Sequence, residues 1–156
     1  MILKPTRFDP EHAEHILANI QQGQAKDGAM SIWNGVAWEK VAKQIFSYSF
    51  VDADLTPIAA FGFIEAWPGR GMAWSLLSNR VGRKEMLYIH RKAVLAAHTA
   101  MNPLTPLNFR RLETAVRTDF PEAVRWIELL GFTREGLMRA YDAAGDDYYL
   151  YSRIRP

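Results

Sequence analysis

Apolar and polar positions recur with distinct periods along the chain, and these periods predict its strands and helices. The clearest unit is LETAVRTDFPEAVRWIELLGF, residues 112–132. Residues 112–116 alternate apolar with polar or small side chains, as a half-buried strand does. Apolar residues then recur at helical spacing until Gly131, which can adopt the left-handed conformation that ends a helix. The unit therefore predicts a strand and then a helix that covers a sheet.

The start of this helix carries a capping pattern. Asp119 stands three residues before Glu122. In such a pair the first side chain accepts a hydrogen bond from an early helix N–H, and the second reaches back to the cap. We therefore expect Asp119 to be the N-cap.

The remaining periods give one consistent order of elements. Asp9 and Pro10 start the first helix with a cap and a proline in the first turn. Residues 21–34 are ambiguous, and the three strands of the middle region are expected to form an antiparallel meander. In chain order we predict a strand at 2–8, helices at 9–20 and 38–45, strands at 46–50, 58–67 and 72–78, a helix at 83–101, a strand at 112–116, a helix at 119–131 and a hairpin strand at 146–154.

Composition narrows the class of protein. With 156 residues, 49% of them hydrophobic, the chain predicts one domain, residues 1–156. The absence of cysteine excludes disulfides, thiolate metal sites and acyl-cysteine intermediates. A net charge of +2, spread along the chain, does not favour nucleic acid. Neither a membrane-length apolar run nor a secretory pattern is present, so we expect a cytoplasmic protein without a membrane partner.

The order of elements resembles that of the GNAT N-acetyltransferase superfamily. Ala123 stands eight residues before Gly131-Phe132, as in many members, and EGLMRAYDAAGDDYYLYSRI resembles the family's closing strands, especially in GNAT-like proteins of tailed bacteriophages. The resemblance implies an α/β fold of the α+β type, with a mixed sheet of six to seven strands and about four helices. It also implies acetyl-coenzyme A as co-substrate.

The family binds the cofactor diphosphate at a glycine turn, which SNRVGRKEM resembles here. Only Gly82 fits the family pattern, because Lys84 stands where a glycine or alanine is usual. On one interpretation Gly82 allows the backbone near Val81 to approach the diphosphate, while Arg80, Arg83 and Lys84 add positive charge. On the other, Gly82 only begins a helix and the bases are solvated.

Further site residues follow from the same resemblance. Backbone N–H groups of Leu76, Leu77 and Ser78 are expected to bind the acetyl carbonyl. Asp119 either bonds the pantetheine chain or only caps its helix. Two family residues are absent, because Phe120 replaces an asparagine that contacts the cofactor and Ile127 replaces a tyrosine that protonates the thiolate.

The catalytic acid and base must then come from elsewhere. Glu65, at the end of an apolar strand, is the candidate base, and Tyr141 is the candidate acid. Each has a simpler alternative, a solvated carboxylate and a surface hydrogen bond.

We therefore expect an acetyltransferase that moves an acetyl group from acetyl-coenzyme A to an amine, on a small molecule or a protein. Without cysteine, the amine is expected to attack directly in a ternary complex. The alternative is a GNAT-like domain without catalysis that binds a partner or belongs to a virion. Transfer of a different acyl group would differ only in pocket size. The chain is also a candidate homodimer.

Overall fold

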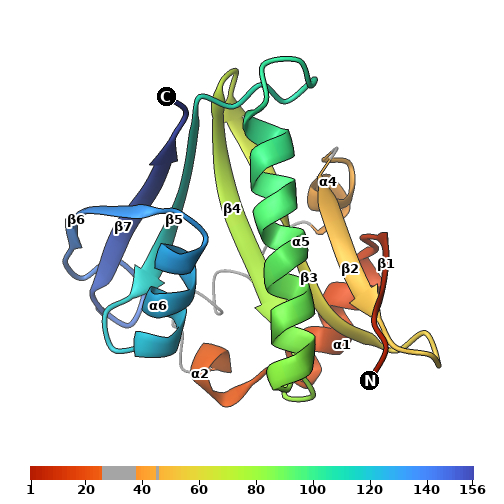
Figure 1. Cartoon of the computed structure of the whole chain (residues 1–156). Coiled ribbons are helices and arrows are strands. Elements are labelled where there is room, and N and C mark those ends of the chain that lie inside the picture. Colours follow the sequence, from red (N-terminus) through yellow and green to blue (C-terminus); the bar gives the residue numbers. More distant parts are fainter. Residues whose placement is uncertain (26–37, 45) are drawn as a thin grey trace.

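The computed structural model describes residues 1–25, 38–44 and 46–156, and it places seven strands in one mixed sheet (Figure 1). The order across the sheet is β1-β2-β3-β4-β5-β7-β6. The strands are β1 (Lys4–Arg7), β2 (Ser47–Val51), β3 (Pro57–Trp67), β4 (Arg70–Leu77), β5 (Arg111–Arg117), β6 (Thr133–Met138) and β7 (Tyr148–Ile154). The described helices are α1 (Pro10–Ala18), α2 (Gln22–Ala25), α4 (Trp38–Ala42), α5 (Arg83–Met101) and α6 (Pro121–Leu129).

The mixed α+β sheet predicted from the sequence is confirmed. Strands β2, β3 and β4 form the expected antiparallel meander, with β1 added at its edge. The chain then crosses over through α5 to β5, which is parallel to β4, and β7 and β6 follow as antiparallel neighbours. Of the ambiguous residues 21–34, four form α2, and those after Ala25 lie outside the described residues.

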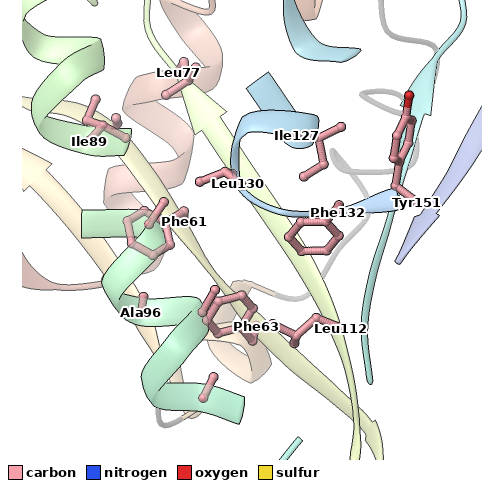
Figure 2. Packing of buried hydrophobic residues seen from close by; sticks show 14 of the residues in the cluster. Phe61, Phe63, Leu77, Ile89, Ala96, Leu112, Ile127, Leu130, Phe132 and Tyr151 are labelled. Carbon is pink, nitrogen blue, oxygen red and sulfur yellow. The ribbon is translucent and has the colours of Figure 1, made fainter. Parts of the chain in front are cut away.

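Hydrophobic side chains fill both faces of the sheet. On one face, the alanine stripe of α5 and the apolar side of α6 pack on phenylalanines from β2 and β3 (Figure 2). Ala93, Ala97 and Ala100 bring α5 close to the strands because their side chains are small. On the other face, α1 and α4 cover a smaller cluster around Trp38 and Trp74. The two helices that follow β4 and β5 therefore lie on the same face.

Of the three helix-end signals predicted at Asp9, Gly131 and Asp119, the structure confirms the first two. Asp9 caps α1 by accepting a hydrogen bond from the N–H of Glu11, at 2.9 Å, and Gly131 follows α6 with a φ of +86°. The predicted cap at Asp119 is wrong. The N-cap of α6 is Phe120, and the Asp119 carboxylate instead accepts hydrogen bonds from Arg117 at 2.5 and 3.1 Å.

Strands β4 and β5 pair over only three residues each, from Arg70–Arg111 to Met72–Glu113. A buried carboxylate clamps this short junction, because Glu113 accepts hydrogen bonds from Arg70 and from Arg111. Burial alone would raise the pKa of Glu113, but the two guanidinium groups outweigh it and hold the pKa below its ordinary value. Beyond the clamp the two strands diverge.

Within the described residues, no helix has both the length and the apolar character needed to span a membrane.

A candidate ligand cleft between diverging strands

A cleft with a volume of about 860 Å³ opens where β4 and β5 separate. In Figure 1 the two strands diverge toward the end of the sheet where α2 lies, with α5 and α6 on either side. The cleft is lined from α2 and the residue before it by Gln21, Gln22, Gly23 and Gln24, from the β4 to α5 segment by Ser75, Leu77, Val81, Gly82, Arg83 and Met86, and from the β5 to α6 segment by Arg117, Asp119, Phe120, Glu122, Ala123, Arg125, Trp126 and Leu129.

The free edge of β4 carries hydrogen-bonding groups that face the cleft. Backbone groups of a strand point alternately to its two neighbours, and Ser78 donates its N–H to Ile58 of β3. Leu76 pairs with β3 in the same way, so only Leu77 and Ser75 present backbone groups on the cleft side. Of the three N–H groups predicted to bind an acetyl carbonyl, only that of Leu77 therefore faces the cleft.

A side-chain amide holds this edge. The N–H of Leu77 donates to Oε1 of Gln24 at 2.8 Å, and Nε2 of Gln24 donates to the carbonyl of Ser75 at 3.1 Å. The N–H of Gln21 also donates to the carbonyl of Leu77, at 3.0 Å. The Gln24 carboxamide thus occupies one donor and one acceptor at the edge of β4 that a neighbouring extended chain could otherwise pair with.

The segment that carries Gln24 also touches the opposite wall of the cleft. A Cβ added to Gly23 would meet the Phe120 ring at 2.5 Å, so only glycine allows this approach. Helix α2 therefore connects the edge of β4 with the start of α6.

Most backbone N–H groups of the turn before α5 already donate hydrogen bonds within the turn and the first turn of the helix. The N–H groups of Arg80 and Val81 donate to Ser78, and the N–H of Gly82 donates to Oε2 of Glu85 at 3.1 Å. Glu85 is buried, and a hydrogen bond from its own backbone N–H is the main cause that lowers its carboxyl pKa. An ionised carboxylate therefore occupies part of the turn where the sequence predicted a diphosphate.

The predicted basic residues of the turn separate in space. Arg83 lines the cleft, whereas the guanidinium of Arg80 is 2.9 Å from the Asp52 carboxylate in the β2–β3 turn. Lys84 is exposed and does not line the cleft. Arg125 of α6 is exposed on the cleft opposite Arg83.

Helix α6 and the end of β5 form the far wall. Arg117 pairs with Asp119 and with Asp146, at 2.5 and 3.0 Å, which places one of the predicted site residues, Asp119, at the rim of the cleft. Trp126 is half-buried, and its indole N–H donates to Nδ1 of His90 at 3.2 Å. This hydrogen bond joins α6 to α5 below the opening.

The two predicted catalytic residues do not line this cleft. Glu65 is exposed and pairs with Gly71 near the β3–β4 turn, toward the clamped end of β4. Tyr141 is 46% exposed in the β6–β7 loop, where its ring packs against Tyr148 at 5.0 Å between centroids. The backbone N–H of Tyr141 donates to the carbonyl of Asp146, and the carboxylate of Asp146 pairs with Arg117. Their proposed roles in proton transfer stay predictions.

Comparison with solved structures identifies the architecture. A GNAT-family acetyltransferase from Bacillus anthracis is 14% identical and matches with a TM-score of 0.68, over 97% of this chain and 94% of that chain. The ribosomal-protein-S5-alanine acetyltransferase of Vibrio fischeri is 16% identical, with a TM-score of 0.66 over 99% and 96%. The spermidine/spermine N-acetyltransferase of Vibrio cholerae is 14% identical, with a TM-score of 0.65 over 97% and 92%. The chain has the GNAT fold. Neither protein-family models nor the curated proteins give a match.

Three residues that shape the cleft in this GNAT fold were not among the site residues predicted from the sequence. Glu85 had a usable signal, because it stands three residues after Gly82 as in a capping box. Gln24 had none, since it reaches β4 across more than fifty residues. Trp126 lies within the predicted helix, but nothing in the sequence indicated its hydrogen bond to His90. In the described part of the chain, no group of three or more metal-ligating side chains occurs.

Proposed function

We propose that this protein is an N-acetyltransferase that transfers an acetyl group from acetyl-coenzyme A to an amine. The observation that supports the proposal best is the cleft between β4 and β5, which opens beside the free edge of β4 in a GNAT fold. Function resides in a site rather than in a fold, so the residues of the cleft must fit the donor.

The pantetheine arm of coenzyme A fits this cleft. The arm is an extended chain with two amides, and the edge of β4 offers one donor and one acceptor at Leu77 and Ser75. These two groups already hold a primary amide, that of Gln24, with good geometry. The carbonyl of one ligand amide and the N–H of the other would pair with the same groups after Gln24 moves away.

The diphosphate fits less completely. Arg83 lines the cleft at the start of α5, where first-turn N–H groups lack helical partners, and Arg125 lines it from α6. Glu85, however, holds the N–H of Gly82 and would repel a phosphate. We therefore expect weak coenzyme A binding that depends on the two arginines and on displacement of the Glu85 carboxylate.

The reaction requires a neutral amine that attacks the thioester carbonyl directly, since the chain has no cysteine to carry the acyl group. The Leu77 N–H is the group of the β4 edge that would stabilise the developing oxyanion or orient the donor. Glu65 and Tyr141 stay our candidates for the proton transfers. Their test is the rate of acetylation over a panel of amines in Glu65→Gln and Tyr141→Phe, and unchanged rates in both variants would remove these assignments.

Calorimetric titration with acetyl-coenzyme A and with free coenzyme A tests the proposal. The informative variant is Gly82→Trp, because a Cβ at this position already meets Glu85 at 2.9 Å and a larger side chain would obstruct the turn. We expect heat of binding for the wild type and its loss in Gly82→Trp. Gly136→Ala is the matched control, because a Cβ at Gly136 has no atom within 4 Å. Absence of heat and of a thermal shift for the wild type at millimolar ligand would refute the proposal.

A second candidate function is favoured by Glu85. A GNAT-like domain that only binds a partner has no need of a diphosphate site, and here a buried carboxylate occupies part of that site. The titration above separates the two functions, since the binding protein would give no signal with coenzyme A and Glu85→Gln would not restore one.

A further inference from the structure

A second, smaller cavity of about 70 Å³ lies deeper in the fold than the cleft. The two share Ser75 of β4 and Trp126 of α6 in their linings, so they adjoin at these residues. Along β4 the cleft contacts Leu77 and Ser75, and the cavity contacts Ser75, Trp74 and Ala73. The cavity therefore continues from the cleft toward the clamped junction of β4 and β5.

The residues of α5 and α6 that line the cleft and the cavity indicate the same direction from one to the other. On α5 the cleft is lined by Met86 and the cavity by Ala93 and Ala97, about two to three turns further along. On α6 the cleft is lined by Ala123 and the cavity by Ile127 and Leu130. A ligand that enters between the strands and extends past Trp126 would reach this space.

The cavity is apolar because of the residues around it. Phe61, Phe63 and Phe132 form its walls, and Figure 2 shows them with Leu130 in the space between α5 and α6. The alanines of α5 leave room that larger side chains would fill. Ser75 and Thr114 bring hydroxyl groups, and Trp126 already donates its indole N–H to His90. A space of this size could hold water, but water needs two to four polar partners, so an apolar occupant is favoured.

We propose that this cavity receives the tail of an acyl chain longer than acetyl, so that the preferred donor is a short linear acyl thioester of about four carbons. This inference rests on the proposed transfer from a coenzyme A thioester to an amine, and it changes the preferred acyl group from acetyl to a longer one. The reaction stays balanced, because the C–N amide bond forms as the C–S bond breaks, the sulfur leaves as thiolate, and the amine proton is released to neutralise it. Ala93 and Ala97 determine the chain length by being small.

Each methylene buried in an apolar site contributes about fourfold in affinity. Butyryl has two methylenes more than acetyl, so we expect the wild type to bind butyryl-coenzyme A about 15-fold more tightly than acetyl-coenzyme A. Isothermal titration with free coenzyme A and with its acetyl, propionyl and butyryl thioesters measures the trend. Equal affinities for all three thioesters would overturn the inference.

Variants then locate the selectivity. Ala97→Leu fills the cavity, and we expect it to remove the preference for butyryl while acetyl and free coenzyme A bind as in the wild type. Ala93→Val is the smaller second variant if Ala97→Leu does not fold by circular dichroism. Ala18→Leu, on the exposed end of α1, adds the same bulk elsewhere and is expected to keep the wild-type trend.

The outcomes separate this inference from the proposed function. Binding of coenzyme A and all thioesters with equal affinity refutes only the acyl preference. A preference for butyryl that both alanine variants retain also refutes it, since the tail would then lie elsewhere. Absence of binding by every ligand, including free coenzyme A, refutes both proposals.

Discussion

Replacement of Gln24 by alanine should strengthen the binding of coenzyme A. The Gln24 carboxamide makes two hydrogen bonds with the edge of β4, at 2.8 and 3.1 Å. The two amides of the pantetheine arm must first displace them in order to pair with Leu77 and Ser75. Alanine removes this competitor but leaves the backbone of α2 and the N–H of Gln21 in place.

The magnitude follows from the two hydrogen bonds. A neutral hydrogen bond contributes about 0.5–1.5 kcal/mol net, so the competition amounts to about 1–3 kcal/mol. Its removal corresponds to an affinity increase of about 5- to 150-fold. The lower half of this range is the expectation, because Gln24 is only half-buried and water solvates part of the freed edge.

Isothermal titration with coenzyme A measures the change, and Gln21→Ala is the matched control. Gln21 also lines the cleft, but it contacts β4 through its backbone N–H, which alanine retains. We expect wild-type affinity in this control. Weaker binding by Gln24→Ala would refute the reasoning, because the side chain would then contribute to the ligand site instead of competing with it.

Three further predictions concern stability and the turn before α5. Gly62→Ala should lower the free energy of unfolding by about 1–3 kcal/mol, since its Cβ would collide with the backbone of Phe46, whereas Gly136→Ala should change it little, as measured by urea denaturation. Glu85→Ala should lower stability through loss of the Gly82 hydrogen bond and of the 3.2 Å ion pair with the Met1 amino group, yet raise coenzyme A affinity in calorimetry, and weaker binding would contradict the electrostatic argument. Hydrogen bonds from Arg111 and Ser152 hold the pKa of Glu135 at about 2, below its ordinary value of 4.5. Its ionised form therefore stabilises the fold above about pH 4.5, and this contribution is lost as the pH falls toward 2. In acid denaturation, Glu135→Gln should lose less stability than the wild type across this range, and identical profiles would show that the pair does not stabilise the fold.

Periodicity was sufficient for the elements of this fold because burial is a local pattern. The alanine stripe of α5 reports which side chains face the sheet, and the structure confirms it. The alternation predicted for β5 is interrupted at Glu113, which is buried beside Leu112 because two arginines pair with it. The prediction of a cap at Asp119 was wrong for a local reason, which is that a competing partner for its carboxylate lies nearby in the sequence. Arg117, two residues earlier, offers a charged partner for the same carboxylate, and Pro121 begins the helix without an N–H.

The candidate site was predictable only in part, because it is built from groups that are distant in sequence. The turn at Gly82 and the strand end at Leu77 line the cleft, so the sequence indicated two of its segments. The amide of Gln24 and the apolar cavity arise from contacts between elements, and no spacing in the sequence indicates them. Glu65 lies near the end of a strand, as the sequence indicated, but that end is toward the clamped junction rather than the cleft.

The three-residue pairing of β4 with β5 divides the hydrogen bonding of the sheet into two parts, β1 to β4 and β5 to β6, that share one short ladder and the Glu113 clamp. Such a sheet has an internal edge where most sheets have continuous hydrogen bonds. A molecule held between the strands would replace the missing ladder, so ligand binding and folding are thermodynamically linked. The protein's resistance to heat and proteolysis should consequently rise with the concentration of a ligand that binds between these strands.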